Sequence, residues 1–116
     1  MLIRIDANAT RPIYDQVASS VRADIVAGRL GPGDRLPPAR EVADAIEVNV
    51  HTVLRAYQQL RDEGLLDLRR GRGAVISASV APLAELAQDI RDLVARAAAL
   101  GVSPAALAAL VKETTE

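Results

Sequence analysis

The sequence contains no cysteine and a single histidine, His51. Without cysteine there is no disulfide scaffold and no thiolate metal or redox site. One histidine is also too few for a multi-histidine metal site. We therefore expect neither a bound metal nor a cofactor.

Long apolar runs are missing as well. Every apolar stretch is broken by charges well before about 18 residues, the shortest run expected of a membrane-spanning helix. The first six residues lack the charged start and long apolar run of a signal peptide. These two features predict a soluble cytoplasmic protein with no membrane partner.

Aromatic residues are almost absent, since the chain has two tyrosines and no phenylalanine or tryptophan. Half of the 116 residues are apolar, so the core is predicted to be aliphatic and rich in alanine. This length suits one ordinary domain plus a small appendage. The net charge of −1 lacks the basic excess usual in nucleic-acid-binding proteins, but three arginines fall within residues 69–72.

The first two thirds of the chain predict a winged helix-turn-helix domain over residues 1–78. A helix from Pro12 to Gly28 carries an apolar residue at every fourth position. Residues 31–34 form a tight loop, and a weak alternation over residues 2–6 predicts a short strand. A helix over about 38–46, a turn, a helix over about 50–63 and short strands over 66–68 and 74–77 follow.

The remaining segment, residues 79–116, predicts two further helices. Together with the winged domain they make a mainly α fold with one small β-hairpin. The first tail helix carries an apolar seam with alternating spacings of three and four. A shorter, alanine-rich last helix cannot bury this seam, so we expect a homodimer, with packing inside one subunit as the alternative. The predicted dimerisation residues are Leu83, Leu86, Ile90, Leu93, Ala97, Leu100, Leu107 and Leu110.

A helix start and an arginine-rich hairpin tip of this kind suit the major groove of DNA and the neighbouring phosphates. Each feature has a structural alternative: an N-cap for Asn49, an ion pair with Asp44 for Arg40, and a solubilising turn for the tip. The predicted contacts with double-stranded DNA are Arg40, Asn49, Val50, His51, Thr52, Arg55, Arg70, Gly71 and Arg72.

An enzymatic function is not expected. The acidic residues are scattered over predicted surfaces, and the glycines at 31 and 33 lack the lysine and the strand-to-helix context of a phosphate-binding loop. Two other functions stay open. One is a winged helix that binds protein rather than DNA, and the other is a metabolite-gated regulator with a small pocket between dimer halves.

The chain resembles the GntR family of bacterial transcription regulators from Pro12 to Ile76. The matching segments are residues 12–17, 28–30, 32–37, 40–43, 52–53, 63–65 and 70–73. The resemblance implies operator contacts by Arg40, by residues 49–52 and by residues 70–72. The short tail is similar to that of the YtrA-like subfamily, which implies a dimer. Because binding near a promoter would exclude polymerase, we expect a repressor on a pseudo-palindromic operator.

Three positions depart from the family pattern. Val50 and Leu54 stand where arginine is frequent, and Glu47 stands where the turn usually has glycine. We therefore expect an operator unlike the common one, with more of the discrimination carried by His51.

Overall fold

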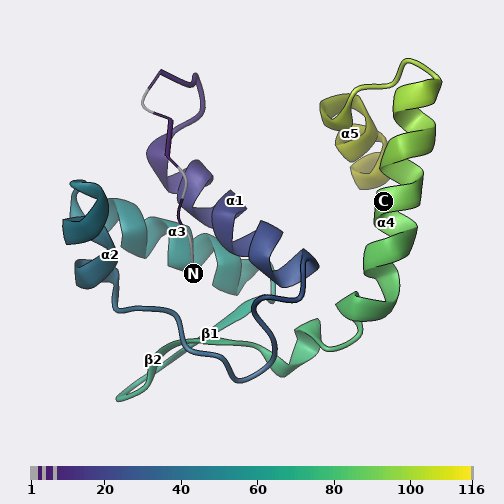
Figure 1. Cartoon of the computed structure of the whole chain (residues 1–116). Helices are drawn as coiled ribbons and strands as arrows, with labels where there is room; N and C mark the ends of the chain where they lie inside the picture. The colour runs from purple at the N-terminus through teal and green to yellow at the C-terminus, as the bar shows by residue number, and fades with distance from the viewer. Residues whose placement is uncertain (1–2, 4, 7, 116) are drawn as a thin grey trace. The chain divides into compact units, whose positions relative to one another are not determined.

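The computed structural model describes residue 3, residues 5–6 and residues 8–115 (Figure 1). Contacts within the chain group it into two compact units, residues 1–82 and residues 83–116. The predicted fold class, mainly α with a small hairpin, is confirmed. The elements in chain order are α1 (Ile13–Val26), α2 (Ala39–Ile46), α3 (Val50–Asp62), β1 (Leu66–Arg69), β2 (Gly73–Ile76), the 3-10 turn η1 (Ala78–Val80), α4 (Leu83–Ala99) and α5 (Pro104–Thr114).

Helix α1 begins after Pro12 because a proline at a helix start loses no hydrogen bond. Its apolar stripe is buried as predicted, with Val17 and Val21 fully inside and Ile25 nearly so. The helix ends at Val26, and Gly28 follows in the left-handed conformation at φ 80°. The stripe packs against α3, so α1 forms one wall of the core.

Helix α3 lies at the centre of the first unit. It contacts α1, α2 and β1, and its inward side chains are 3% exposed or less. These side chains are Val53, Ala56, Tyr57 and Leu60. A bidentate ion pair links the carboxyl end of α3 to α1. The Arg22 guanidinium lies 2.6 and 2.8 Å from the Glu63 carboxylate oxygens. This guanidinium holds the pKa of Glu63 below its usual range.

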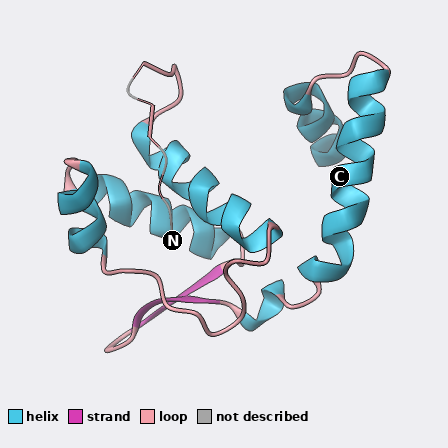
Figure 2. Ribbon diagram, in the orientation of Figure 1, coloured by secondary structure: helices cyan, strands magenta, loops and turns pink. Residues whose placement is uncertain are grey.

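The two strands form an antiparallel hairpin in which Leu66 pairs with Ile76 and Arg69 with Gly73 (Figure 2, magenta). The segment before α2 lies along the free edge of β2. Arg35 pairs with Val75 there, and the Leu36 amide donates to the Ala74 carbonyl at 2.9 Å. The sequence predicted only a tight loop before α2, so this edge pairing was not foreseen.

The strand predicted over residues 2–6 is not formed by the described residues of that segment, Ile3, Ile5 and Asp6. The buried amide of Gln16 takes the place of a partner strand. Its oxygen accepts from the Asp6 amide at 2.7 Å, and its nitrogen donates to the carbonyls of Asp6 and Arg11 at 3.0 and 3.1 Å. The Asp6 amide and carbonyl already have hydrogen-bond partners in the Gln16 side chain, so they do not require a neighbouring strand. Leu2 and Arg4 lie outside the described residues.

The second unit is a helical pair. Helix α5 begins at Pro104, and the Ser103 hydroxyl accepts from the Ala106 amide at 3.1 Å as an N-cap. Ala97 on α4 is buried. Among the described residues no single helix is long and apolar enough to cross a membrane. Helices α4 and α5 would reach that length and composition only together, and they bend by 119° at their junction.

The turn between α2 and α3 depends on Glu47. Its φ of 57° and ψ of 49° are left-handed, and among the described residues it is the only non-glycine with positive φ. A side chain in this conformation costs about 1–2 kcal/mol relative to the right-handed region. The turn geometry is therefore imposed by the two helices it joins, at a cost that glycine would avoid.

We predict that Glu47→Gly raises the free energy of unfolding by about 1 kcal/mol, because glycine adopts positive φ without steric cost. Urea unfolding followed by circular dichroism measures the change. As a matched control, Ala45→Gly in the last turn of α2 should lower stability by about 1 kcal/mol. Equal destabilisation by both substitutions would contradict a strained turn.

Candidate nucleic-acid interface

A hydrogen bond from α3 fixes where α2 begins. The Tyr57 hydroxyl donates to the carbonyl of Pro37 at 2.7 Å, and the Tyr57 side chain is 3% exposed. Burial, helped by the nearby negative charge of Glu41, raises the pKa of Tyr57 well above its usual value, so the hydroxyl remains a donor. Pro37 and Pro38 then lead into the first turn of α2.

Arg40 occupies that first turn and is exposed. The alternative role, an ion pair with Asp44 one turn on, is not among the ion pairs that the described residues form. Its guanidinium therefore remains open to an external anion, as a phosphate contact requires.

The first turn of α3 presents the predicted base-reading residues at the surface. His51 and Asn49 are exposed, while Val50 and Thr52 are half-buried. Asn49 is also the N-cap, since its side-chain oxygen accepts from the His51 amide at 2.8 Å. Capping uses the oxygen of Asn49 but leaves its NH₂ group as a donor.

Arg55 is held against α1. Its guanidinium carbon lies 3.9 Å from the centroid of the Tyr14 ring, a cation–π contact. The sequence placed Arg55 one turn beyond the helix start without this partner. Stacking occupies one face of the guanidinium and leaves its N–H edge free to donate to an external acceptor.

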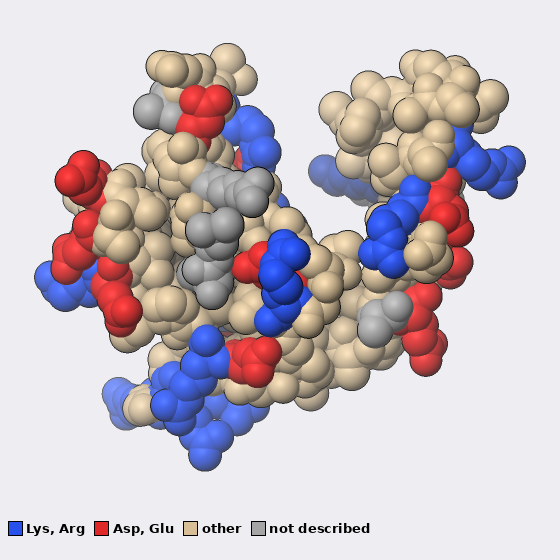
Figure 3. Space-filling model, viewed as in Figure 1, with Lys and Arg blue, Asp and Glu red and all other residues tan. Residues whose placement is uncertain are grey.

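The hairpin tip carries exposed arginines on a glycine turn. Gly71 and Gly73 have φ of 82° and 71°, and the Arg72 amide donates to the Arg69 carbonyl at 3.1 Å to close the turn. Arg70 and Arg72 are exposed, as is Gly71 between them. Figure 3 shows basic side chains gathered around this end of the first unit, so a positive tip faces solvent.

Arg35 is a candidate that the sequence reasoning missed. Its pairing with Val75 brings it beside the hairpin, and its side chain is exposed. The sequence carries no local signal for this placement, because residues 31–34 before Arg35 indicate only a tight loop. Arg35 adds a cation to the base of the hairpin.

Charge is separated along this surface. Acidic side chains gather over α2, where Glu41, Asp44 and Glu47 are exposed, whereas arginines dominate the hairpin tip (Figure 3). The start of α3 and the tip both lie toward the left of the first unit in Figure 1. A polyanion would therefore meet the tip favourably, whereas on α2 the exposed Arg40 is the cation among these acidic side chains.

A family model described as bacterial regulatory proteins, gntR family, matches residues 13–76, from the start of α1 to the end of β2. The chain belongs to the GntR family. The HTH-type transcriptional repressor YtrA of Bacillus subtilis (strain 168) is 41% identical to this GntR chain over 76 residues, which cover 66% of the chain and 58% of the repressor. The match thus spans less than two thirds of that repressor's length.

Two solved structures extend the comparison. YtrA from Sulfolobus acidocaldarius, a GntR-family transcription factor, is 36% identical with a TM-score of 0.64, covering 85% of this chain and 99% of that one. The AraR DNA-binding domain in complex with operator ORE1 is 25% identical with a TM-score of 0.56, covering 66% and 94%. The predicted GntR and YtrA-like resemblance is confirmed, and the relatives that the chain matches are transcription regulators.

Proposed function

We propose that this GntR-family chain acts as a dimeric repressor in the cytoplasm and reads a pseudo-palindromic operator. The observation that carries the proposal is the exposure, in one compact unit, of both the α3 start and the arginine tip. Two copies related by a two-fold axis would place two α3 helices in successive major grooves. A dimer bound over a promoter would exclude polymerase.

The roles of the contact residues follow from their chemistry. His51 and the Asn49 NH₂ group can hydrogen-bond base edges, and Val50 can contact a thymine methyl group. Thr52 lies in the same turn and can hydrogen-bond either a base or a phosphate.

The arginines are proposed to contact phosphates. They are Arg40 on α2, Arg35 and Arg55 beside the core, and Arg70 and Arg72 at the tip. Gly71 lets the tip backbone approach the sugar-phosphate wall.

The tail helices supply the proposed dimer contact. Leu86, Ile90 and Leu93 recur along α4 and are each 43–48% exposed, while Leu100 and Leu110 are more exposed still. Val94 on α4 and Val111 on α5, which are not among the predicted dimerisation residues, are exposed as well. Leu83 and Leu107 are half-buried, and Ala97 is already buried. A second copy covering this face would remove a row of large apolar side chains from water.

The salt dependence of DNA binding tests the role of the tip. Arg72→Ala should weaken binding to every sequence and reduce the slope of log K against log salt by about one, because one phosphate contact is lost. Fluorescence anisotropy over a salt series measures both quantities. Arg61→Ala, at the other end of α3, should leave the slope unchanged. An unaltered slope for Arg72→Ala would remove the tip from the interface.

Selection of bound sequences from a random DNA pool tests the role of His51. His51→Ala should relax the preference at one or two base pairs in each half-site and cost about 1–3 kcal/mol in affinity for the best site. A recovered consensus identical to that of the unmodified protein would show that His51 does not read bases.

Light scattering tests the dimer. Leu93→Glu should give monomers, because two carboxylates would be buried in an apolar contact. Ala95→Glu is the matched control, since Ala95 is exposed on α4 but lies nearly opposite Leu93 around the helix. Leu93→Glu protein that remains dimeric would place the interface elsewhere.

A further inference from the structure

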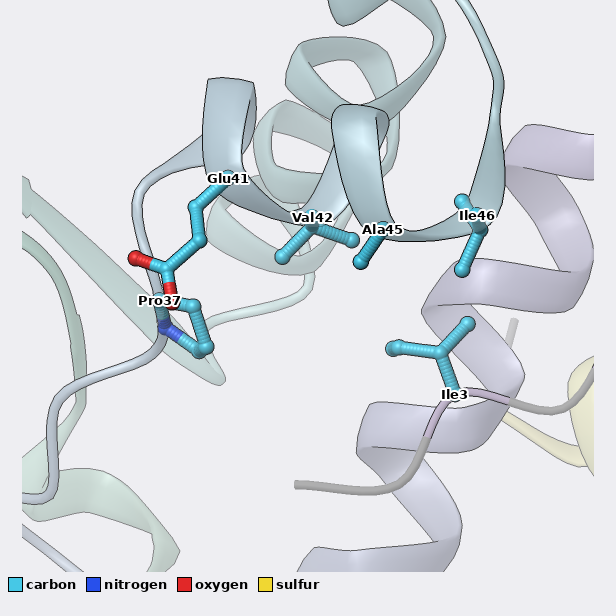
Figure 4. Close-up of a pocket in the computed structure, with 6 residues that line it drawn as sticks. All are labelled: Ile3, Pro37, Glu41, Val42, Ala45 and Ile46. Atoms are coloured by element: carbon cyan, nitrogen blue, oxygen red, sulfur yellow. The ribbon is translucent and has the colours of Figure 1, made fainter.

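A small groove lies on α2 away from the residues proposed to contact DNA. Its volume is about 240 Å³ and its lining residues are Ile3, Pro37, Glu41, Val42, Ala45 and Ile46 (Figure 4). The α2 residues come from one helix face, and Ile3 reaches it from the N-terminal segment. The groove is thus built from two segments far apart in the sequence.

The two ends of the groove differ in chemistry. Ile3 faces Ile46 and Ala45 at one end, whereas the Glu41 carboxylate lies beside Pro37 at the other (Figure 4). Val42, which is 5% exposed, lies between the ends. Glu41 and Ile46 are five residues apart, about 7.5 Å along the helix axis. The described lining residues are therefore aliphatic except for the Glu41 carboxylate.

Among the residues that the structure describes, no cation forms an ion pair with that carboxylate. The helix that carries Glu41 adds further acids at Asp44 and, just beyond its end, Glu47. Arg40 is its sequence neighbour but makes no ion pair with it. A carboxylate at the rim of an apolar groove is complementary to a cation that carries its own apolar body.

We propose that this groove binds a small organic cation with a compact aliphatic body and a single ammonium head. The ammonium group would lie against the Glu41 carboxylate, and the aliphatic body would lie over Val42 and Ala45 towards Ile3 and Ile46. The volume is below the roughly 300 Å³ at which drug-sized sites begin, so a larger ligand would not fit. No residue proposed to contact DNA lines the groove.

Calorimetric titration of the full chain with cyclohexylmethylammonium chloride tests the proposal, with cyclohexylmethanol as the neutral probe of the same shape. The unmodified protein should bind the ammonium saturably and about tenfold more tightly than the alcohol, because only the ammonium places a positive charge against the carboxylate. Glu41→Gln should abolish that difference while leaving weak binding of the alcohol.

Two further variants complete the test. Ala45→Leu should block both probes, because leucine at this exposed helical position fills the groove without disturbing the core. Asp44→Asn removes one charge from the same helix outside the groove and should leave both affinities unchanged. The site would be supported by saturable binding that Ala45→Leu abolishes. The preference for the ammonium over the alcohol should also require Glu41. Absence of saturable binding, or unchanged affinity in Glu41→Gln or Ala45→Leu, would overturn it.

Discussion

The structure depends on the double role of α3. Its inward side must fill the centre of the first unit, where Val53 and Leu60 are fully buried between α1, α2 and β1. Its amino end must stay at the surface to meet a partner. Thirteen residues satisfy both demands because a helix sends one face inward and leaves the first turn beyond the packed region. The elements that contact it, α1, α2 and β1, can be understood by how they hold this helix.

The surroundings of α3 fix its position through specific contacts rather than through apolar packing alone. Tyr57 bonds the carbonyl of Pro37 and thereby sets the start of α2, where Arg40 lies. Arg22 and Glu63 tie the far end of α3 to α1, and Arg55 stacks on Tyr14 near its start. These contacts hold the helix along its length, so the cations around it occupy defined places. Such preorganisation reduces the entropy lost when DNA binds.

Much of this arrangement could be predicted from residue spacing. The four-residue repeat in α1, the N-cap at Asn49 and the glycine-rich hairpin turn each follow local rules, and each is present in the structure. What could not be predicted depends on contacts between distant segments. The edge pairing of Arg35 with Val75 and the stacking of Arg55 on Tyr14 have no local sequence signature. The strand expected near the N-terminus failed because Gln16, ten residues away, satisfies the Asp6 backbone instead.

The start of α3 and the arginine tip are proposed to contact the same DNA duplex. Amide chemical shifts of the full chain, recorded with and without a duplex that the protein has selected, show which residues are at the interface. We expect residues 49–52 and residues 69–73 to shift together as duplex is added, while residues 23–28 at the end of α1 remain unchanged. Shifts confined to one of the two segments, or centred on the end of α1, would contradict this proposal.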